Sequence, residues 1–311
     1  MTKKELARFL QKFALPEPEF HVWTLTFGEH RSRLIGEGIE FKEFTEYEPG
    51  EDVTDIDPEV TLREGKPMVR KNLTEEKMRH AILFDDSPSL RYYGMRETAI
   101  VALGCYLLSS TALKDPVRVV ALNGGASPFV SPLVYGADDV AAVLYEVWDM
   151  PQRTPVAPTT LEACSNDAAH VLSLDNTRLL FISDFLFADT KPVYDHATQT
   201  VVLDGRDILR RAVGGTYAGG TSSMELAFLG VSPQWETFRD QVGFYYVVDA
   251  ENGSTSLEHF TKRSARKFIE RQLAGERAWV DAARSLGAPM GWVRTGDPAQ
   301  IVQQLERSFG G

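Results

Sequence analysis

The stretch from residue 81 to residue 113 constrains the fold more than any other part of the chain. Four apolar residues, 81–84, run directly into a polar turn, and an apolar segment without charges follows at 98–113. This order predicts a buried strand, a loop at its carboxyl end and a helix packed behind it. Ligand sites in open α/β sheets lie at the carboxyl ends of the strands, so the loop at 85–89 is the first candidate site.

That loop carries the spacing D-x-S-x-S, formed by Asp85, Ser87 and Ser89. One carboxylate and two hydroxyls at alternating positions can converge on one point, and such hard oxygen ligands suit Mg²⁺. A simpler interpretation is that Asp85 and the serines only cap the next helix. The loop alone does not decide between the two.

The remainder of the chain alternates apolar runs with helical patterns. A second buried strand is predicted at 178–184 and ends on Asp184. Strands that alternate with helices favour a doubly wound, mainly parallel α/β sheet. Ahead of the predicted strand at 81–84, glycines separate short β-like segments, which indicates a small N-terminal β-rich lobe. We therefore expect an N-terminal helix and lobe at 1–75, and an α/β domain at 76–311 with an insertion around 214–260.

Composition limits the partners and the compartment. The 311 residues carry a formal net charge of -11, so the average surface repels a phosphate backbone and nucleic acid is not an expected partner. The two cysteines, Cys105 and Cys164, are expected to be buried thiols in a reducing compartment. The N-terminus lacks a continuous apolar signal region, and no apolar segment is long enough to span a bilayer. We expect a cytoplasmic protein.

A threonine pair, Thr159-Thr160, opens the predicted helix that precedes the Asp184 strand. The order of a D-x-S-x-S loop, a threonine loop and a strand-end aspartate resembles von Willebrand factor A domains and their metal-ion-dependent adhesion site. The resemblance implies a fold of von Willebrand factor A type and one metal site with an open position for a partner's carboxylate. The implied metal ligands are Asp85, Ser87, Ser89, Thr159 and Asp184.

The metal implied by this resemblance is Mg²⁺, with Mn²⁺ or Ca²⁺ as alternatives. Thr159 is preferred for the second loop because T-x-L before a helix matches Thr159-Thr160-Leu161. The family usually has glycine before that threonine, whereas this chain has Pro158. The choice between Thr159 and Thr160 therefore stays open.

The resemblance extends on both sides of the loop. Segments at 28–32, 36–41, 47–52 and 56–57, and a later one at 248–253, resemble one bacterial group. It is the group of MoxR-associated proteins catalogued as a domain of unknown function, the fifty-eighth of that series. The similarity covers roughly residues 25–308. It implies a protein-interaction role, as an adaptor of a MoxR-type AAA+ ATPase.

The chain departs from that group at three positions. The group typically has arginine where this chain has Thr45 and Thr54, and tryptophan where it has Pro58. Losing two guanidinium groups removes bidentate donors for carboxylate or phosphate. Acidic residues dominate 37–59, where Lys42 is the only basic one. This run is interpreted as a solvated face, with a docking face for a basic partner as the alternative.

Three functions remain open. The first is a non-enzymatic, Mg²⁺-dependent module that binds an acidic residue of a partner protein. The second is a Mg²⁺-dependent phosphohydrolase with Asp85 as nucleophile. That enzyme needs a general-acid carboxylate two residues on, where this chain has Ser87, and the adjacent Asp86 is expected to point elsewhere. The third is a scaffold whose metal site is vestigial. We expect the first, without catalytic or nucleotide-binding residues.

Overall fold

The computed structural model describes most of the chain and forms two compact units, Glu29–Met78 and a larger one that includes everything from Arg79 onward. The described residues are 4, 32–36, 40–48, 52–76, 79–112, 115–122, 128–151, 160–169, 177–190, 193–195, 200–204, 225–249 and 254–309.

The smaller unit is a three-stranded antiparallel sheet in the order β1-β3-β2, with two short helices. Its elements are β1 (Ser32–Gly36), β2 (Glu40–Glu46), η2 (Val53–Asp55), α2 (Pro58–Glu64) and β3 (Met68–Glu76). Helix α2 begins where the Asp57 carboxylate accepts hydrogen bonds from the N–H groups of Glu59 and Val60, and it ends at Gly65 with φ 73°. The β-rich lobe expected from the sequence is present, whereas the N-terminal helix expected ahead of it lies almost entirely outside the described residues.

The three departures from the resembled group lie in this unit. Pro58 occupies the first turn of α2, where its fixed φ suits a helix start. The Thr54 hydroxyl donates to Asp52 Oδ1 at 2.8 Å, while the buried Thr45 hydroxyl has no hydrogen-bond partner among the described residues. The described acidic side chains of 37–59 are exposed except for the half-buried Asp57, which agrees with a solvated face.

The larger unit is built on a six-stranded sheet in the order β13-β10-β7-β4-β5-β6. The strands are β4 (Arg79–Asp85), β5 (Val117–Leu122), β6 (Phe129–Val130), β7 (Thr177–Ser183), β10 (Glu225–Val231) and β13 (Met290–Val293). All neighbours are parallel except β5 and β6. Counted along the chain, this is the order 6-5-4-1-2-3 of a doubly wound sheet. The predicted fold class is confirmed.

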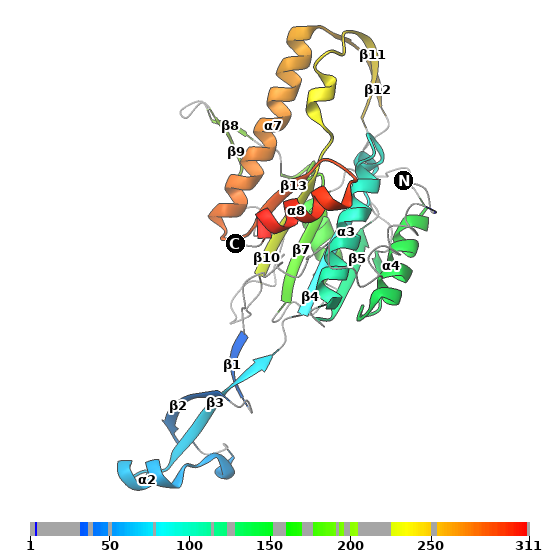
Figure 1. Cartoon of the computed structure of the whole chain (residues 1–311). Coiled ribbons are helices and arrows are strands. Elements are labelled where there is room, and N and C mark those ends of the chain that lie inside the picture. The colour runs from blue at the N-terminus through cyan, green and yellow to red at the C-terminus, as the bar shows by residue number, and fades with distance from the viewer. Residues whose placement is uncertain are drawn as a thin grey trace. The chain divides into compact units, whose positions relative to one another are not determined.

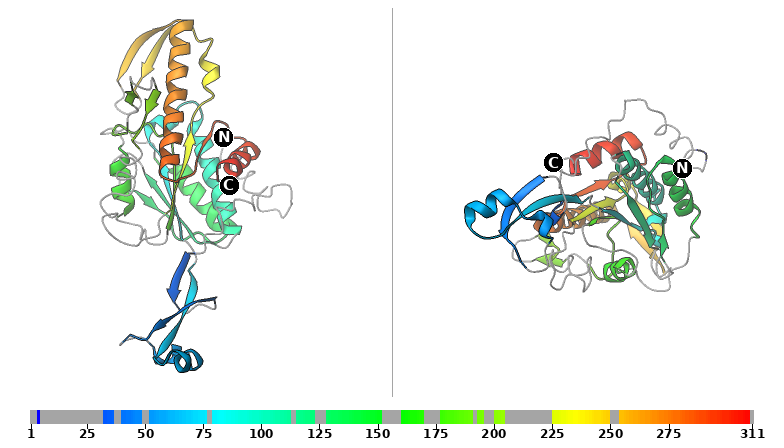
Figure 2. Two further views of the ribbon diagram at one scale, coloured as in Figure 1. Left: turned by 90° about the vertical axis from the view of Figure 1, so that its left-hand side faces the viewer. Right: turned by 90° about the horizontal axis from the view of Figure 1, so that it is seen from below.

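Helices cover both faces of this sheet, as Figures 1 and 2 show. One face packs against α3 (Met95–Ala112), α4 (Ala137–Asp149) and α8 (Pro298–Phe309), and the other against α5 (Leu161–Ala169) and α7 (Lys262–Ser285). Side chains alternate between the faces, so Ile82 and Phe84 enter the first core while Ala81 and Leu83 enter the second. Burial on both faces explains why the middle of β4, residues 81–84, is a continuous apolar run.

The remaining elements lie outside the central sheet. They are η3 (Pro88–Arg91), β8 (Val193–Asp195), β9 (Thr200–Val202), η5 (Trp235–Phe238), β11 (Gly243–Val248) and β12 (Thr255–Phe260). The predicted insertion around 214–260 contains the central strand β10 as well as the β11–β12 hairpin. Cys105 and Cys164 are both buried, as predicted, and neither is joined in a disulfide. Within the described segments, no helix combines the length and the apolar character needed to cross a bilayer.

We expect Gly230→Ala to destabilise the larger unit. Gly230 pairs with Trp292 across β10 and β13, and a Cβ at position 230 would overlap the Trp292 ring. Moving a packed indole should lower the free energy of unfolding by about 1–3 kcal/mol. Urea unfolding measures the change. The control is Gly296→Ala, whose Cβ would meet Thr98 Oγ1 at an ordinary 3.7 Å. Equal midpoints for both variants would contradict this packing.

Candidate functional site

The candidate site lies where the strand order of the central sheet reverses. The chain proceeds outward from β4 to β5 in one direction and from β7 to β10 in the other, so β4 and β7 flank the switch point. Asp85 is the last residue of β4, and Asp184 directly follows the last residue of β7. Because the two strands are parallel neighbours, both aspartates lie at the same edge, where doubly wound sheets bind ligands.

The first loop is folded around Asp85. The Ser87 N–H donates to Asp85 Oδ1 at 2.8 Å, and the hydroxyl oxygens of Ser87 and Ser89 lie 2.9 Å apart. Ser87 precedes η3, but its side chain makes no capping hydrogen bond there. The two serine hydroxyls therefore meet each other instead of serving as helix caps.

The third loop is joined to the first by Ser183. Its hydroxyl donates to Asp85 Oδ2 at 2.7 Å and accepts from the Phe185 N–H at 2.9 Å. The Asp184 carboxylate accepts from the Leu186 N–H at 3.0 Å. Phe185 has φ 57°, a left-handed conformation that is unfavourable for a bulky side chain, and its ring packs 4.7 Å from that of Trp279. The turn after β7 is thus held by packing.

Burial and charge raise the pKa of Asp85. Its side chain is only 3% exposed. Desolvation and the neighbouring Asp184 charge raise its pKa to about 7, against the opposing effect of the hydrogen bonds from Ser183 and Ser87. Two buried carboxylates at one edge, without an adjacent Lys or Arg among the causes of that shift, form a place where a cation would be stabilised.

The second loop is only partly described. Thr159 lies outside the described residues, whereas Thr160 caps α5 by accepting the Ala163 N–H at 3.2 Å. The Asp189 carboxylate accepts from the N–H groups of Leu161 and Glu162 at 2.9 and 3.2 Å. Asp189 therefore fixes the start of α5 against the loop that follows β7, and the choice between the two threonines stays a prediction.

Asp86 points away from Asp85, as the sequence predicted. It is 1% exposed and forms a two-pronged ion pair with Arg96 of α3, at 2.6 Å to Nε and 3.2 Å to Nη2. Arg96 also donates to the Val147 carbonyl at 2.7 Å. The ion pair therefore connects the first loop to α3, and the hydrogen bond to Val147 connects Arg96 to α4.

Three residues that shape the site were not predicted from the sequence: Ser183, Arg96 and Asp189. A polar residue at the end of an apolar strand, as at Ser183, is a usable signal. Arg96 and Asp189 act across 10 and 27–28 residues, and no local pattern marks such partners.

The donor set fits a hard divalent cation. Mg²⁺ binds oxygen at roughly 2.0–2.1 Å in an octahedron, so adjacent ligands lie about 2.9 Å apart, as the Ser87 and Ser89 oxygens do. In the part of the chain that the structure describes, no group of three or more His, Cys, Asp or Glu side chains could hold a metal. A site here would therefore depend on hydroxyls and two carboxylates. The ligand set itself stays a prediction.

The family comparison matches about half of the chain. A family model described as "Protein of unknown function DUF58" matches residues 43–207. That range includes the first loop, both threonines and the third loop. No curated protein matches the chain.

Several solved structures are similar to the chain at low identity. An aerotolerance-related membrane protein from Bacteroides fragilis is 11% identical, with 75% of this chain and 98% of that chain covered and a TM-score of 0.41. The conserved hypothetical protein BatB from Bacteroides thetaiotaomicron is 10% identical, with 75% and 100% covered and a TM-score of 0.39. A von Willebrand factor type A structure from Catenulispora acidiphila is 14% identical, with 77% and 43% covered and a TM-score of 0.37. Similarities this weak carry no argument about function.

Proposed function

The chain belongs to the DUF58 family, and from this premise we propose that it is a Mg²⁺-dependent protein-interaction module without a catalytic role. The observation that carries the proposal is that Asp85 and Asp184 lie at the same edge of the sheet, at the switch point. Beside them, the Ser87 and Ser89 hydroxyl oxygens have the spacing of two ligands of one ion. The function would be to take an acidic side chain of a partner protein at the metal.

Each residue of the site has a stated part in this proposal. Ser87 and Ser89 would hold the ion through their hydroxyls, together with Asp184 and the second-loop threonine, Thr159 or Thr160. Asp85, the remaining member of the predicted ligand set, would give up its proton and add negative charge, while Ser183 and the Ser87 N–H keep its carboxylate oriented. When bound, Mg²⁺ supplies a positive centre with room for an external carboxylate.

The partner is proposed from sequence resemblance alone. The resembled group implies a MoxR-type AAA+ ATPase that offers an Asp or Glu. The net charge of -11 repels an acidic partner at long range, so the attraction must be local to the ion. Binding should therefore depend on the metal more than on ionic strength.

Hydrolysis of phosphate esters is the weaker alternative. Both oxygens of Asp85 already accept hydrogen bonds, and the general-acid position is occupied by Ser87, whose hydroxyl faces Ser89. Asp86 is committed to Arg96. These contacts leave no second carboxylate in the first loop to donate a proton to a leaving group.

The proposal predicts that Ser87→Ala weakens Mg²⁺ binding by about tenfold or more, because it removes one of few ligands. Isothermal calorimetry of the wild type against this variant measures the change. The matched control is Ser256→Ala, which removes an exposed serine of β12. Equal Mg²⁺ affinities in all three proteins would contradict the ligand set.

The same variants test the partner. Pull-down from cell extract should recover the partner with Mg²⁺ present, lose it in EDTA and lose it with Ser87→Ala. If EDTA and Ser87→Ala both leave recovery unchanged, the metal site is not the contact. The acidic run at 37–59 then becomes the candidate surface, and recovery should fall as salt rises.

A further inference from the structure

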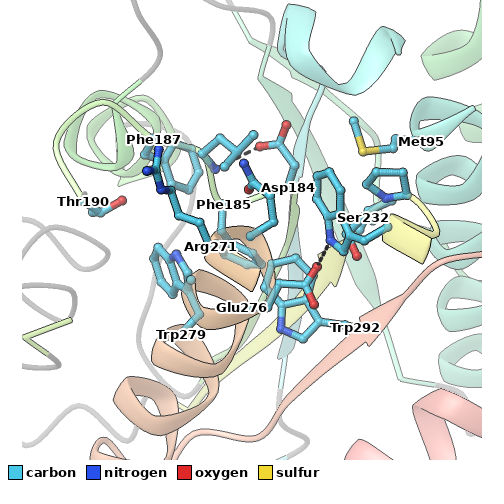
Figure 3. Close-up of a pocket in the computed structure, with 16 residues that line it drawn as sticks. Met95, Asp184, Phe185, Phe187, Thr190, Ser232, Arg271, Glu276, Trp279 and Trp292 are labelled. Carbon is cyan, nitrogen blue, oxygen red and sulfur yellow. Dashed lines mark hydrogen bonds between the residues drawn. The ribbon is translucent and has the colours of Figure 1, made fainter. Parts of the chain in front are cut away.

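A cavity of about 700 Å³ lies beside the third loop, between the residues that follow β7 and β10 and one face of α7 (Figure 3). Its lining is more apolar than polar and includes five aromatic side chains, those of Phe185, Phe187, Trp235, Trp279 and Trp292. A volume of this size and an apolar lining with few polar groups are typical of sites for small organic ligands.

Three hydrogen-bond donors of the lining have no partner among the described residues. They are the hydroxyls of Thr190 and Ser232, which are 5% and 4% exposed, and the indole Nε1 of Trp292. A buried polar group without a partner is unfavourable. An indole N–H can only donate, so whatever satisfies Trp292 must bring an acceptor.

Two of these donors belong to one side of the sheet. Trp292 pairs with Gly230, and its ring lies where a Cβ of residue 230 would be. Ser232 follows Gly230 by two residues and continues the ladder through its N–H to the Val293 carbonyl at 3.0 Å. Since side chains alternate along an extended chain, Ser232 is on the same side as the Trp292 indole.

Helix α7 presents a glycine to the cavity. Arg271, Gly275 and Trp279 all line it and are spaced four residues apart, so they share one face of the helix. Glycine is among the poorest residues in a helix interior, and at this position it leaves empty the space that a side chain would occupy. This is a second indication, independent of the donors, that the volume is kept open.

The charged groups of the cavity are balanced. Glu276 accepts from Trp235 Nε1 at 2.6 Å and pairs with Arg294. Of the other two charged residues in the lining, Arg271 is positive and Asp184 negative. The lining therefore selects neither an anion nor a cation. We propose that this cavity binds a small, uncharged aromatic molecule that carries an acceptor oxygen such as a ketone, and that this binding does not need the metal although Asp184 borders both sites.

The probe for this proposal is prodan, an uncharged naphthyl ketone whose emission shifts to the blue outside water. Titration in EDTA separates the result from the metal site. The wild type should bind one prodan saturably, with blue-shifted emission. Gly275→Leu should weaken binding at least about tenfold because leucine fills the cavity while favouring the helix. The control is Arg277→Leu, which adds the same side chain at an exposed position of α7 and should bind as the wild type does.

Variants of the donors provide a second readout. Thr190→Val and Ser232→Ala should each weaken prodan binding about three- to tenfold, while the thermal midpoint stays equal or rises, since neither hydroxyl has a described partner to lose. A wild type that does not bind prodan overturns the proposal. So does Gly275→Leu with wild-type affinity, or donor variants that lose stability and keep their affinity.

Discussion

Asp85→Asn is expected to stabilise the metal-free protein at about pH 8 and to abolish its response to Mg²⁺. Burial and Asp184 raise the pKa of Asp85 from 3.8 to about 7, so the folded state binds this proton more tightly than the unfolded state does. The contribution of Asp85 to the free energy of unfolding therefore falls as the pH rises from 3.8 to about 7. Above that range the ionised, buried carboxylate destabilises the folded state to its full extent. Asparagine removes the charge and keeps an acceptor for the Ser87 N–H.

The expected gain in the free energy of unfolding is on the order of 1–3 kcal/mol. Removing the buried charge stabilises the folded state, but the new amide disturbs the Ser183 hydrogen bond and offsets part of that gain. Thermal unfolding in EDTA at about pH 5 and about pH 8 measures it, and the advantage of the variant should appear only at the higher pH. Adding millimolar Mg²⁺ should then raise the midpoint of the wild type alone.

The control is Asp240→Asn, which neutralises an exposed carboxylate of the same unit. It should leave both the pH dependence and the Mg²⁺ response of the wild type unchanged. An Asp85→Asn protein that is less stable than the wild type at the higher pH, or that still gains stability from Mg²⁺, would show that the two aspartates do not form a cation site.

Arg96→Met is expected to be the most destabilising of the substitutions considered, with a loss of about 3–5 kcal/mol. Burial raises the pKa of Asp86, and the hydrogen bond and charge of Arg96 oppose that rise. Without Arg96, a carboxylate that is 1% exposed has lost its bidentate partner. The Val147 and Trp148 carbonyls also lose a donor. Urea unfolding measures the loss.

The double variant Asp86→Asn/Arg96→Met serves as the control. It should recover part of the loss, since no uncompensated charge remains buried. The single variant should also regain stability as pH falls, because the raised pKa of Asp86 lets the folded state take up a proton. An Arg96→Met protein within about 0.5 kcal/mol of the wild type would mean that the pair does not hold the loop.

Local patterns in the sequence predicted much of the fold and part of the site. The apolar run before Asp85 and the one before Asp184 predicted two buried strands, because only strands covered on both faces are apolar throughout. Alternation of strands and helices predicted the doubly wound sheet, and from it the position of Asp85, Ser87, Ser89 and Asp184 at the carboxyl ends of strands. The expectation that Asp86 points elsewhere is also confirmed.

The metal, its second-loop ligand and the partner are not decided by the fold. Thr159 lies outside the described residues, and the Thr160 hydroxyl accepts the Ala163 N–H at the start of α5. These parts of the site remain predictions that rest on resemblance and await the Mg²⁺ experiments.

The sequence by itself determined which segments are buried strands and which residues end them, because periodicity and polarity are local properties. Only the tertiary structure decided that β4 and β7 are neighbours, that Ser183 bonds to Asp85 and that Arg96 neutralises Asp86. It also assembled the cavity from the segment that follows β7, the end of β10, α7 and β13. The physical reason is that each of these contacts joins segments distant along the chain. Which distant segments meet depends on how the strands are ordered and packed, and no local pattern encodes that order.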